Sequence, residues 1–468
     1  MLNKKLKYLL TVLVLSLLFV FDSFASNNTS YLNNSNNYGN GNNKNNNPNY
    51  NNGNYQYQYQ NMPPLKDVVY SYFDNVELNG TIHIEIMEHK NKGKAFAVFD
   101  GDIAEPRMLN TQGTRLKLGV SKKLSDRSKI NFTIKESHEK GLTFEDVYFA
   151  FNITDELSLY VGQKYARNFL LIEDDADTML MPNFVRFNRV GDLFNNLGFG
   201  VSATYFTDTW GIDYGVYGND VESKSSDKNQ VITNLRGYYS PYNKDGIFVH
   251  LGASYYYKNE TFNEGKKFEA VDGNGNAITT PTPTELAKIK SFNLFDIRNL
   301  HKVGFEAIFN YKNYNLMGEY NDAWLYPAEK SLRNEDVHYH INGYYIQAST
   351  TLTGEYYSYS KGMLNPYKVK NSLTENGFGA FELGFRYAFS DMRDGNATIN
   401  PLVYDGFDYG VYKEYTAMLN WAATDFLRII LSYSRNEEKF DNMLMQSLNN
   451  KQKNNKYDVY MLTARIYF

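Results

Sequence analysis

Charged side chains recur at alternate positions in many segments of this chain, opposite a face of apolar residues. From Val76 to Met87, for example, Leu78 and Ile84 share one face, whereas Glu77 and Glu85 share the other. Side chains of a β-strand alternate between its two faces, so this pattern predicts strands with one apolar and one charged surface. Charges gathered on one such surface can attract, repel or orient small solutes by electrostatic forces.

The phase of the predicted strands assigns basic and acidic residues to the same polar surface. The basic set is Arg115, Lys117, Lys135, Lys164, Arg236, Arg386, Arg428 and Arg465. The acidic set is Glu77, Glu85, Asp146, Asp213, Glu306, Glu319, Glu382 and Glu414. The first four basic residues lie on predicted strands within 114–164, and the last four acidic ones lie on predicted strands within 300–422. A closed barrel places these two arcs roughly opposite each other, which would set a field across its lumen. In the alternative interpretation, each charge only satisfies a neighbour in a wet interior.

The long segment 165–196 is the candidate constriction of that lumen. Its apolar clusters, Leu170–Ile172 and Met179–Met181, would rarely stay together on an exposed loop, so we expect the segment to fold inward against the wall. Its charged residues are Arg167, Asp174, Asp175, Arg186 and Arg189. The carboxylate oxygens of the acidic run Glu173–Asp175 would suit calcium, but the run lacks the turn glycine of a known calcium-binding loop. We therefore favour an acidic run that is solvated or paired with arginines over a calcium site.

Other chemistry finds little support in the residues. The chain has no cysteine, no glycine-rich phosphate loop and no nucleophile elbow. His338 and His340 share one predicted strand face, where ordinary polar roles are favoured over metal chelation. A net charge of −4 is too mild to indicate a nucleic-acid partner. We therefore expect no catalytic residue, no metal site and no cofactor, although a hydrolase whose serine and histidine lie on different strands would leave no local motif.

Sixteen strands are predicted to position these side chains. They lie at 76–87, 114–124, 129–137, 143–153, 157–164, 197–207, 210–218, 230–240, 246–256, 300–311, 313–324, 338–352, 377–390, 409–422, 425–434 and 457–468. Tight turns alternate with long connections, as in outer-membrane barrels with short periplasmic turns and long outer loops. This parity holds if 353–376 is one long periplasmic crossing. The expected fold class is all-β: a transmembrane antiparallel β-barrel of about 16 strands with a pore-constricting third loop.

The two ends of the chain indicate where such a barrel would reside. The last strand alternates up to the aromatic Phe468, which we interpret as the membrane-insertion signal at the periplasmic face. Residues 1–25 combine lysines, a short apolar run and a final small residue, as in a signal peptide that is cleaved on export. Residues 26–65 are rich in asparagine and are expected to be a disordered spacer, which leaves 66–468 for the barrel.

Several segments resemble the phosphate-selective porin O/P family of Gram-negative outer membranes. The residues that carry the resemblance are Arg236–Ser254, Gly343–Ser349, Leu352–Glu355, Gly379–Tyr387 and Leu419–Trp421, together with Val161–Gln163 before the long segment. They occur in the order seen in that family and extend the resemblance over essentially Val76 to Phe468. The resemblance implies a sixteen-stranded trimeric porin that passes anions, with basic side chains guiding phosphate.

Two classes of function remain open at this stage. The first is an outer-membrane porin, a water-filled channel for passive diffusion of small hydrophilic solutes with an anion or phosphate preference. The second is a barrel that acts as a surface adhesin or antigen through loops 257–299 and 435–456. Sixteen strands leave a channel, which favours the porin. Expected partners are outer-membrane lipid, two further copies in a homotrimer, small anions or other hydrophilic solutes, and the barrel-assembly machinery.

Overall fold

The computed structural model describes thirteen stretches of the chain, all within the unit from Tyr70 to Phe468. They are residues 76–91, 107–110, 115–137, 141–168, 170, 197–221, 228–262, 279–281, 288–290, 297–327, 339–394, 407–439 and 454–468.

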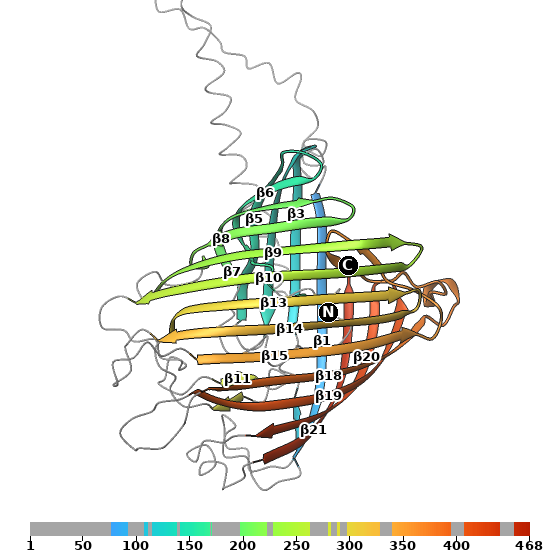
Figure 1. The fold of residues 1–468 in the computed structure, drawn as a ribbon. Helices are drawn as coiled ribbons and strands as arrows, with labels where there is room; N and C mark the ends of the chain where they lie inside the picture. The colour runs from blue at the N-terminus through green and yellow to red at the C-terminus, as the bar shows by residue number, and fades with distance from the viewer. Residues whose placement is uncertain are drawn as a thin grey trace, which may run out of the picture. The chain divides into compact units, whose positions relative to one another are not determined.

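Sixteen long strands form a closed antiparallel barrel (Figure 1). In chain order they are β1 (Val76–Asn91), β3 (Arg115–Ser125), β4 (Ser128–Ser137), β5 (Gly141–Asn152), β6 (Leu157–Tyr165), β7 (Leu197–Phe206), β8 (Trp210–Tyr217), β9 (Lys228–Lys244), β10 (Ile247–Phe262), β13 (Ile297–Tyr311), β14 (Tyr314–Pro327), β15 (Tyr339–Thr351), β18 (Ala380–Asp394), β19 (Phe407–Thr424), β20 (Leu427–Lys439) and β21 (Asn454–Tyr467). The short β2 (Arg107–Asn110) continues the β3 side of β1 toward the long-loop end. The predicted strand count and fold class are confirmed.

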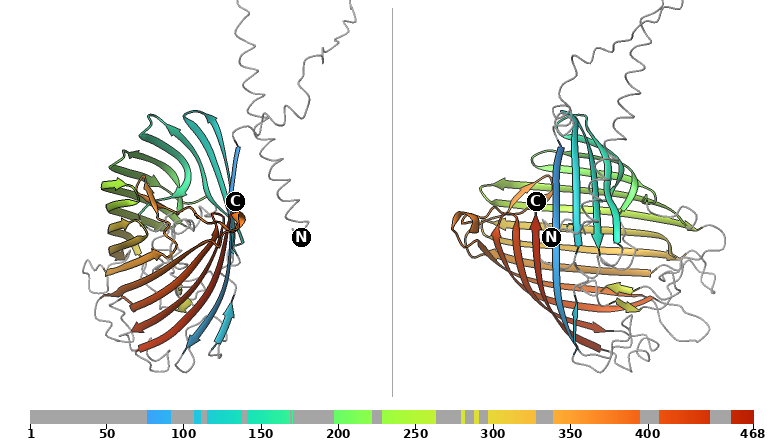
Figure 2. Two further views of the ribbon diagram at one scale, coloured as in Figure 1. Left: turned by 90° about the vertical axis from the view of Figure 1, so that its right-hand side faces the viewer. Right: turned by 180° about the vertical axis from the view of Figure 1, so that it is seen from behind.

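The barrel closes where the first strand meets the last. β1 pairs with β3 on one side and with β21 on the other, in a register that runs from Thr81 opposite Tyr467 to Asn91 opposite Tyr457 (Figure 2). Gly80 and Phe468 exchange backbone hydrogen bonds of 2.8 and 3.0 Å. The Phe468 ring lies where a Cβ at Gly80 would be, at 2.5 Å, so a larger residue would displace the ring. The predicted closing strand therefore completes the wall, and no edge remains between β1 and β21.

Tight turns gather at one end of the barrel, where β1 begins and β21 ends. Only two residues separate β3 from β4, β9 from β10, β13 from β14 and β19 from β20. Asp245 and Gly246 both adopt positive φ, 56° and 74°, in one of these turns, as two-residue hairpins favour. The connection from β15 to β18 leaves from the same end and contains one short strand pair, β16 (Ser358–Ser360) with β17 (Met363–Asn365), and one 3₁₀ turn. It contributes no wall strand, which confirms the predicted parity.

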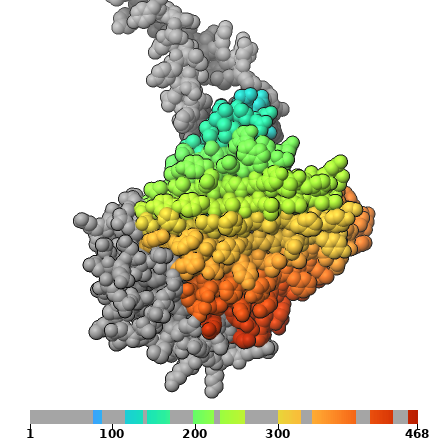
Figure 3. All heavy atoms as spheres, in the orientation of Figure 1, coloured from blue at the N-terminus to red at the C-terminus, as the bar shows by residue number. Residues whose placement is uncertain are grey.

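The outer surface of the wall, one side of which is drawn in Figure 3, exposes many large apolar side chains. Its exposed aliphatic residues include Val161, Leu235, Leu251, Ile346 and Leu431. Exposed aromatic residues lie nearer the two ends, among them Phe151, Trp210, Tyr239, Tyr314 and Phe426 toward the tight turns and Tyr255, Tyr326, Tyr344, Tyr415 and Tyr460 toward the long loops. An aliphatic band between two aromatic girdles matches the cross-section of a bilayer. No helix among the described residues is long and apolar enough to cross a membrane.

The inner surface departs from the predicted alternation at a bulge in β5. Phe132 pairs with Val147 and Ile134 pairs with Phe144, so two residues of β5 oppose a single residue of β4. The bulge changes the phase of the strand and buries the carboxylate of Glu145 on the lumen side. The sequence pattern had assigned only Asp146 to this surface.

Candidate functional site in the barrel lumen

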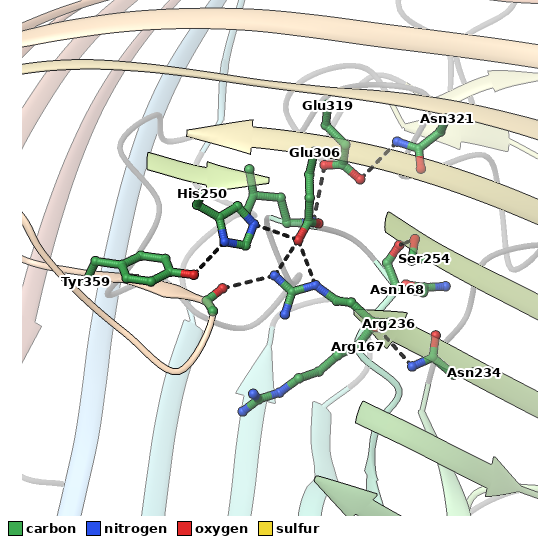
Figure 4. A network of polar contacts seen from close by, with 12 residues as sticks. Arg167, Asn168, Asn234, Arg236, His250, Ser254, Glu306, Glu319, Asn321 and Tyr359 are labelled. Carbon is green, nitrogen blue, oxygen red and sulfur yellow. Dashed lines mark hydrogen bonds and ion pairs between the residues drawn. The ribbon is translucent and has the colours of Figure 1, made fainter. Parts of the chain in front are cut away.

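Two segments enter the barrel, one from each group of connections. The first begins directly after β6, at Ala166 to Asn168, and the second is the 352–379 connection between β15 and β18. Both reach the inner faces of β9, β10, β13 and β14, where Figure 4 shows their polar contacts. These contacts bring charged groups of the wall together with backbone groups of both segments inside the barrel.

The start of the first segment crosses from β6 to the far wall. The carbonyl of Asn168 accepts hydrogen bonds from Ser254 Oγ at 3.1 Å and from the Lys302 ammonium. The backbone N–H of Leu170 donates to Glu319 Oε2 at 3.3 Å. Asn234 Nδ2 donates to the carbonyl of Arg167 at 2.9 Å, and Figure 4 shows the Arg167 side chain extending away from this anchor. The expected inward course is thus seen at its beginning, while Asp174, Asp175, Arg186 and Arg189 lie outside the described residues.

The second segment packs on an apolar patch of the inner wall. Tyr359 stacks on Phe248 with ring centroids 5.2 Å apart, and Tyr357, Leu364 and Tyr367 are buried in the same cluster. The wall residues of this cluster include Phe248, Ile308, Met317, Met418 and Ile430. Apolar side chains that face a lumen would otherwise contact water, so their burial fixes the segment to the wall.

Polar contacts then fix the orientation of that segment. The Tyr359 hydroxyl lies 2.6 Å from His250 Nδ1, and Arg236 Nη2 donates to the carbonyl of Gly362 at 3.0 Å. Tyr357 donates to Glu382 Oε1 at 2.7 Å. Burial raises the pKa of the Tyr357 hydroxyl well above its usual value, and the field of Glu382 raises it further. Tyr357 therefore stays neutral and remains a hydrogen-bond donor to the carboxylate.

A buried ion pair lies where the two segments approach each other. Nη2 and Nε of Arg236 lie 2.6 and 2.9 Å from one carboxylate oxygen of Glu306, and His250 Nε2 lies 2.9 Å from the same oxygen (Figure 4). Arg236, His250 and Glu306 are each at least nine-tenths buried. Because the three groups satisfy one another, Arg236 presents little net charge to a passing solute.

The other predicted cations of this half of the wall are buried as well. Arg386 forms an ion pair with Glu414 at 2.6 Å, and the same Glu414 oxygen accepts a hydrogen bond from Thr416. Arg428 lies over the ring of Tyr367 at 4.8 Å, which is a cation–π distance. We call the inner faces of β9 to β20, with their paired Arg236, Glu306, Glu319, Glu382, Arg386 and Glu414, the paired wall.

The inner faces of β3 to β6 differ. Lys117 and Lys135 each lie 3.1 Å from Glu145, and their side chains remain 27% and 19% exposed while Glu145 is almost fully buried. Arg115 is also partly exposed, whereas Lys164 is buried and lies 4.0 Å over the ring of Tyr160. We call these faces, with Arg115, Lys117, Lys135 and Lys164, the basic wall. Two lysines share one carboxylate there, so a net positive charge borders the lumen.

Three contributors escaped the sequence analysis. Glu145 was missed because the β5 bulge changes the strand phase. Lys302 shares the inward phase of Glu306 and could have been found from that alternation. His250 shares the inward phase of Phe248, and the run of inward apolar residues on neighbouring strands was itself a signal that something covers them.

The chain is similar to known outer-membrane porins. The family model described as "Phosphate-selective porin O and P" matches residues 91–459. Among solved structures, OprB of Pseudomonas putida at high pH is 10% identical with a TM-score of 0.50, over 86% of this chain and 97% of that one. An anion-selective porin from Comamonas acidovorans is 12% identical with a TM-score of 0.48, over 84% of this chain and 99% of that one. No curated protein sequence matches. At these identities the structural likeness shows the fold alone.

Proposed function

This chain belongs to the phosphate-selective porin O and P family, and we propose that it is an outer-membrane channel for passive diffusion of small hydrophilic solutes with a mild preference for anions. Family membership supports the channel and its location in the outer membrane. The observation that carries the anion preference is the contrast in the lumen: Lys117 and Lys135 stay partly exposed around one buried Glu145, whereas Arg236 and Arg386 are neutralised by their own carboxylates.

The location of the basic wall supports this preference. Arg115, Lys117 and Lys135 lie on adjacent strands, with Lys117 directly opposite Lys135 in the β3–β4 register. The fields of neighbouring cations add, and at physiological salt they act over a screening length of about 8 Å. Arg167 and Lys164 extend the positive region toward the start of the constricting segment. An anion that passes this wall is therefore attracted by several cations at once.

The assignment includes expectations that family membership and the sequence support together. We propose that residues 1–25 are cleaved on export and that residues 26–65 form a spacer before the barrel domain at 66–468. We also propose that the assembly machinery recognises Phe468 and that the barrel works as a homotrimer. We assign no catalytic residue to it. The alternative of an adhesin rests on loops 257–299 and 435–456, most of which lie outside the described residues.

Planar-bilayer recording tests the proposal. The folded full-length protein should give discrete conductance steps, and in a salt gradient the zero-current potential should have the sign of an anion-preferring pore. Absence of conductance would overturn the channel and favour the adhesin. A wild-type pore that prefers cations would overturn the anion preference but leave the channel intact.

A further inference from the structure

Four ring side chains form a row on the outside of the barrel, near its long-loop end. In the strand register, Tyr257 of β10 is opposite His301 of β13, His301 is opposite Trp324 of β14, and Trp324 is opposite His340 of β15. These four strands are neighbours in the wall (Figure 1). We call the four residues the ring row. They lie on the outward faces of their strands, which are the faces that carry the exposed apolar residues.

Contacts between the rings fix their orientation. The ring centroid of His301 lies 4.8 Å from that of Tyr257, and its Nδ1 atom lies 2.7 Å from the hydroxyl of Tyr255. Trp324 stacks on His340, with ring centroids 5.5 Å apart and 28° between the ring planes. Cross-strand ring pairs of this kind stabilise one another. The ring row is therefore an ordered surface of flat side chains.

Hydrogen-bonding groups border the ring row on both sides. Toward the apolar band, Asp322 contacts Nε2 of His340 through Oδ1 and keeps 20% of its side chain exposed. Asn342 is opposite Asp322 in the register and is partly exposed. Toward the long loops, Asn299 accepts a hydrogen bond from Asn259. Carboxylates and amides have several hydrogen-bonding sites each, so these groups can bind a further partner.

The charge of this patch differs from that of the outer surface of β20 and β21. At the long-loop end of those two strands, Arg435 is paired with Asp458, and Lys456 is paired with Glu437. At the same end of β10, β13, β14 and β15, none of the outward side chains that the structure describes belongs to lysine or arginine. The patch therefore offers rings, amides and the carboxylate of Asp322, and no fixed cation that would attract a phosphate.

The height of the ring row on the wall indicates which molecule reaches it. Along β14, the outward residues run from Leu316 through Tyr320 and Asp322 to Trp324 toward the long loops. The row thus lies just beyond the apolar band, at the level of the lipid headgroups. In outer-membrane barrels the long loops are on the outer side, so these headgroups belong to the outer leaflet. Because the patch continues the membrane-facing surface, a membrane lipid is its natural occupant.

We propose that the ring row binds the sugar headgroup of a glycolipid in the outer leaflet. The C–H face of a sugar ring packs on flat aromatic side chains, and its hydroxyl groups hydrogen-bond to carboxylates and amides such as those of Asp322 and Asn342. The charge of the patch favours a neutral sugar or an amino sugar over a phosphate. The site lies outside the pore, so glycolipid binding depends on the outer-membrane location and not on the ions that the channel conducts.

Trp324 can report on this site by its fluorescence. The chain has three tryptophans, and the other two, Trp210 and Trp421, lie near tight turns. The full-length double variant Trp210→Phe with Trp421→Phe is placed in phosphatidylcholine nanodiscs that also contain either monoglucosyl diacylglycerol or phosphatidylglycerol. The glucolipid should shift the emission to shorter wavelength and reduce quenching by acrylamide, whereas phosphatidylglycerol should change neither. Equal changes with the two lipids, or no change with the glucolipid, would overturn the proposal.

Substitutions locate the binding in a second measurement. Native mass spectrometry of protein released from the glucolipid nanodiscs counts the lipid that each barrel retains, and it does not need the double tryptophan variant. Asp322→Asn and Trp324→Leu should each weaken retention by roughly tenfold. The matched control is Asp458→Asn, an outward carboxylate on β21 that is held by Arg435 and Tyr433, which should retain the glucolipid fully.

Two outcomes of these measurements would contradict the site. The first is full retention of the glucolipid in the folded Asp322 and Trp324 variants. The second is an emission of Trp324 that changes with protein concentration in the absence of glucolipid, because a second copy of the chain would then cover the ring row.

Discussion

The basic wall and the paired wall both carry charged side chains, but only the paired wall buries them beneath segments that enter the barrel. On the paired wall, Glu306 has Arg236 and His250 as partners within 2.9 Å, and Glu414 has Arg386. On the basic wall, Lys117 and Lys135 share Glu145 and stay in contact with the lumen. The same residue types therefore serve two purposes: on one wall they hold inserted segments in place, and on the other they create a potential.

Breaking a buried pair on the paired wall should have the largest effect. Glu306→Ala leaves Arg236 without its carboxylate, and removal of one partner of a buried ion pair typically costs about 3–5 kcal/mol. We expect a clear drop in the unfolding midpoint of the detergent-folded protein, measured by heat-modifiable migration. Asp155→Ala, in an exposed tight turn, is the matched control. Equal midpoints for the two variants would show that the Glu306 pair does not hold the paired wall together.

Neutralising the basic wall should change selectivity. A cation that is partly exposed to the lumen, as Arg115, Lys117 and Lys135 are, attracts an anion 4 Å away by on the order of 1 kcal/mol in water. Changing these three residues together with the buried Lys164 to Gln should therefore lower the anion-to-cation permeability ratio by roughly fivefold or more. The measurement is the zero-current potential in a salt gradient.

Two further variants refine that selectivity experiment. Adding Glu145→Gln to the four substitutions removes the buried carboxylate that has lost its two lysines, and it should move the potential back toward the wild-type value. The double variant Arg236→Gln with Glu306→Gln removes one charge of each sign from the paired wall and should leave the potential nearly unchanged. A larger shift from this double variant than from the basic-wall variant would reverse the comparison.

Removing a single hydroxyl from the inserted 352–379 segment should have a smaller effect. Tyr359→Phe deletes the hydrogen bond to His250 but keeps the stacking on Phe248. We expect a loss of about 1 kcal/mol in the free energy of unfolding and no change in the zero-current potential. A changed potential would mean that this hydroxyl contacts permeating ions and that the paired wall also takes part in selectivity.

The smallest expected effect is on the stability of the folded barrel at high pH. Burial raises the pKa of Tyr357 and Tyr367 in the folded barrel above that in the unfolded chain, which is about 10. The stability that these two groups contribute is therefore fully present below the unfolded pKa and is lost as the pH rises through the folded pKa. Fewer tyrosines should therefore ionise near pH 10 in the folded protein than in the unfolded protein, so the rise in tyrosinate absorbance should be smaller. Tyr357→Phe should reduce that difference. Full titration of the folded protein near pH 10 would show that the inserted segment is open to water.

Alternation within the sequence determined the wall of this protein. A strand with period two has only one phase that turns its apolar residues, such as Leu78 and Ile84, toward lipid. The number of strands, the closing strand and the inward position of charges such as Arg236, Glu306 and Arg465 therefore follow from the local pattern. The inward positions of the apolar residues Phe248, Ile308 and Met317 also indicate that a segment covers them.

Only the tertiary structure decided which inward charges neutralise one another. Arg236 and Glu306 are 70 positions apart and meet because β9 and β13 both flank β10, while Tyr359 reaches His250 from a connection 109 positions away. The β5 bulge brought Glu145 between two lysines, and closure of the wall aligned Arg428, Arg465, His83 and Arg115. Period two fixes the face on which a side chain lies, but its neighbours across the sheet depend on register and barrel closure, which bring distant strands together.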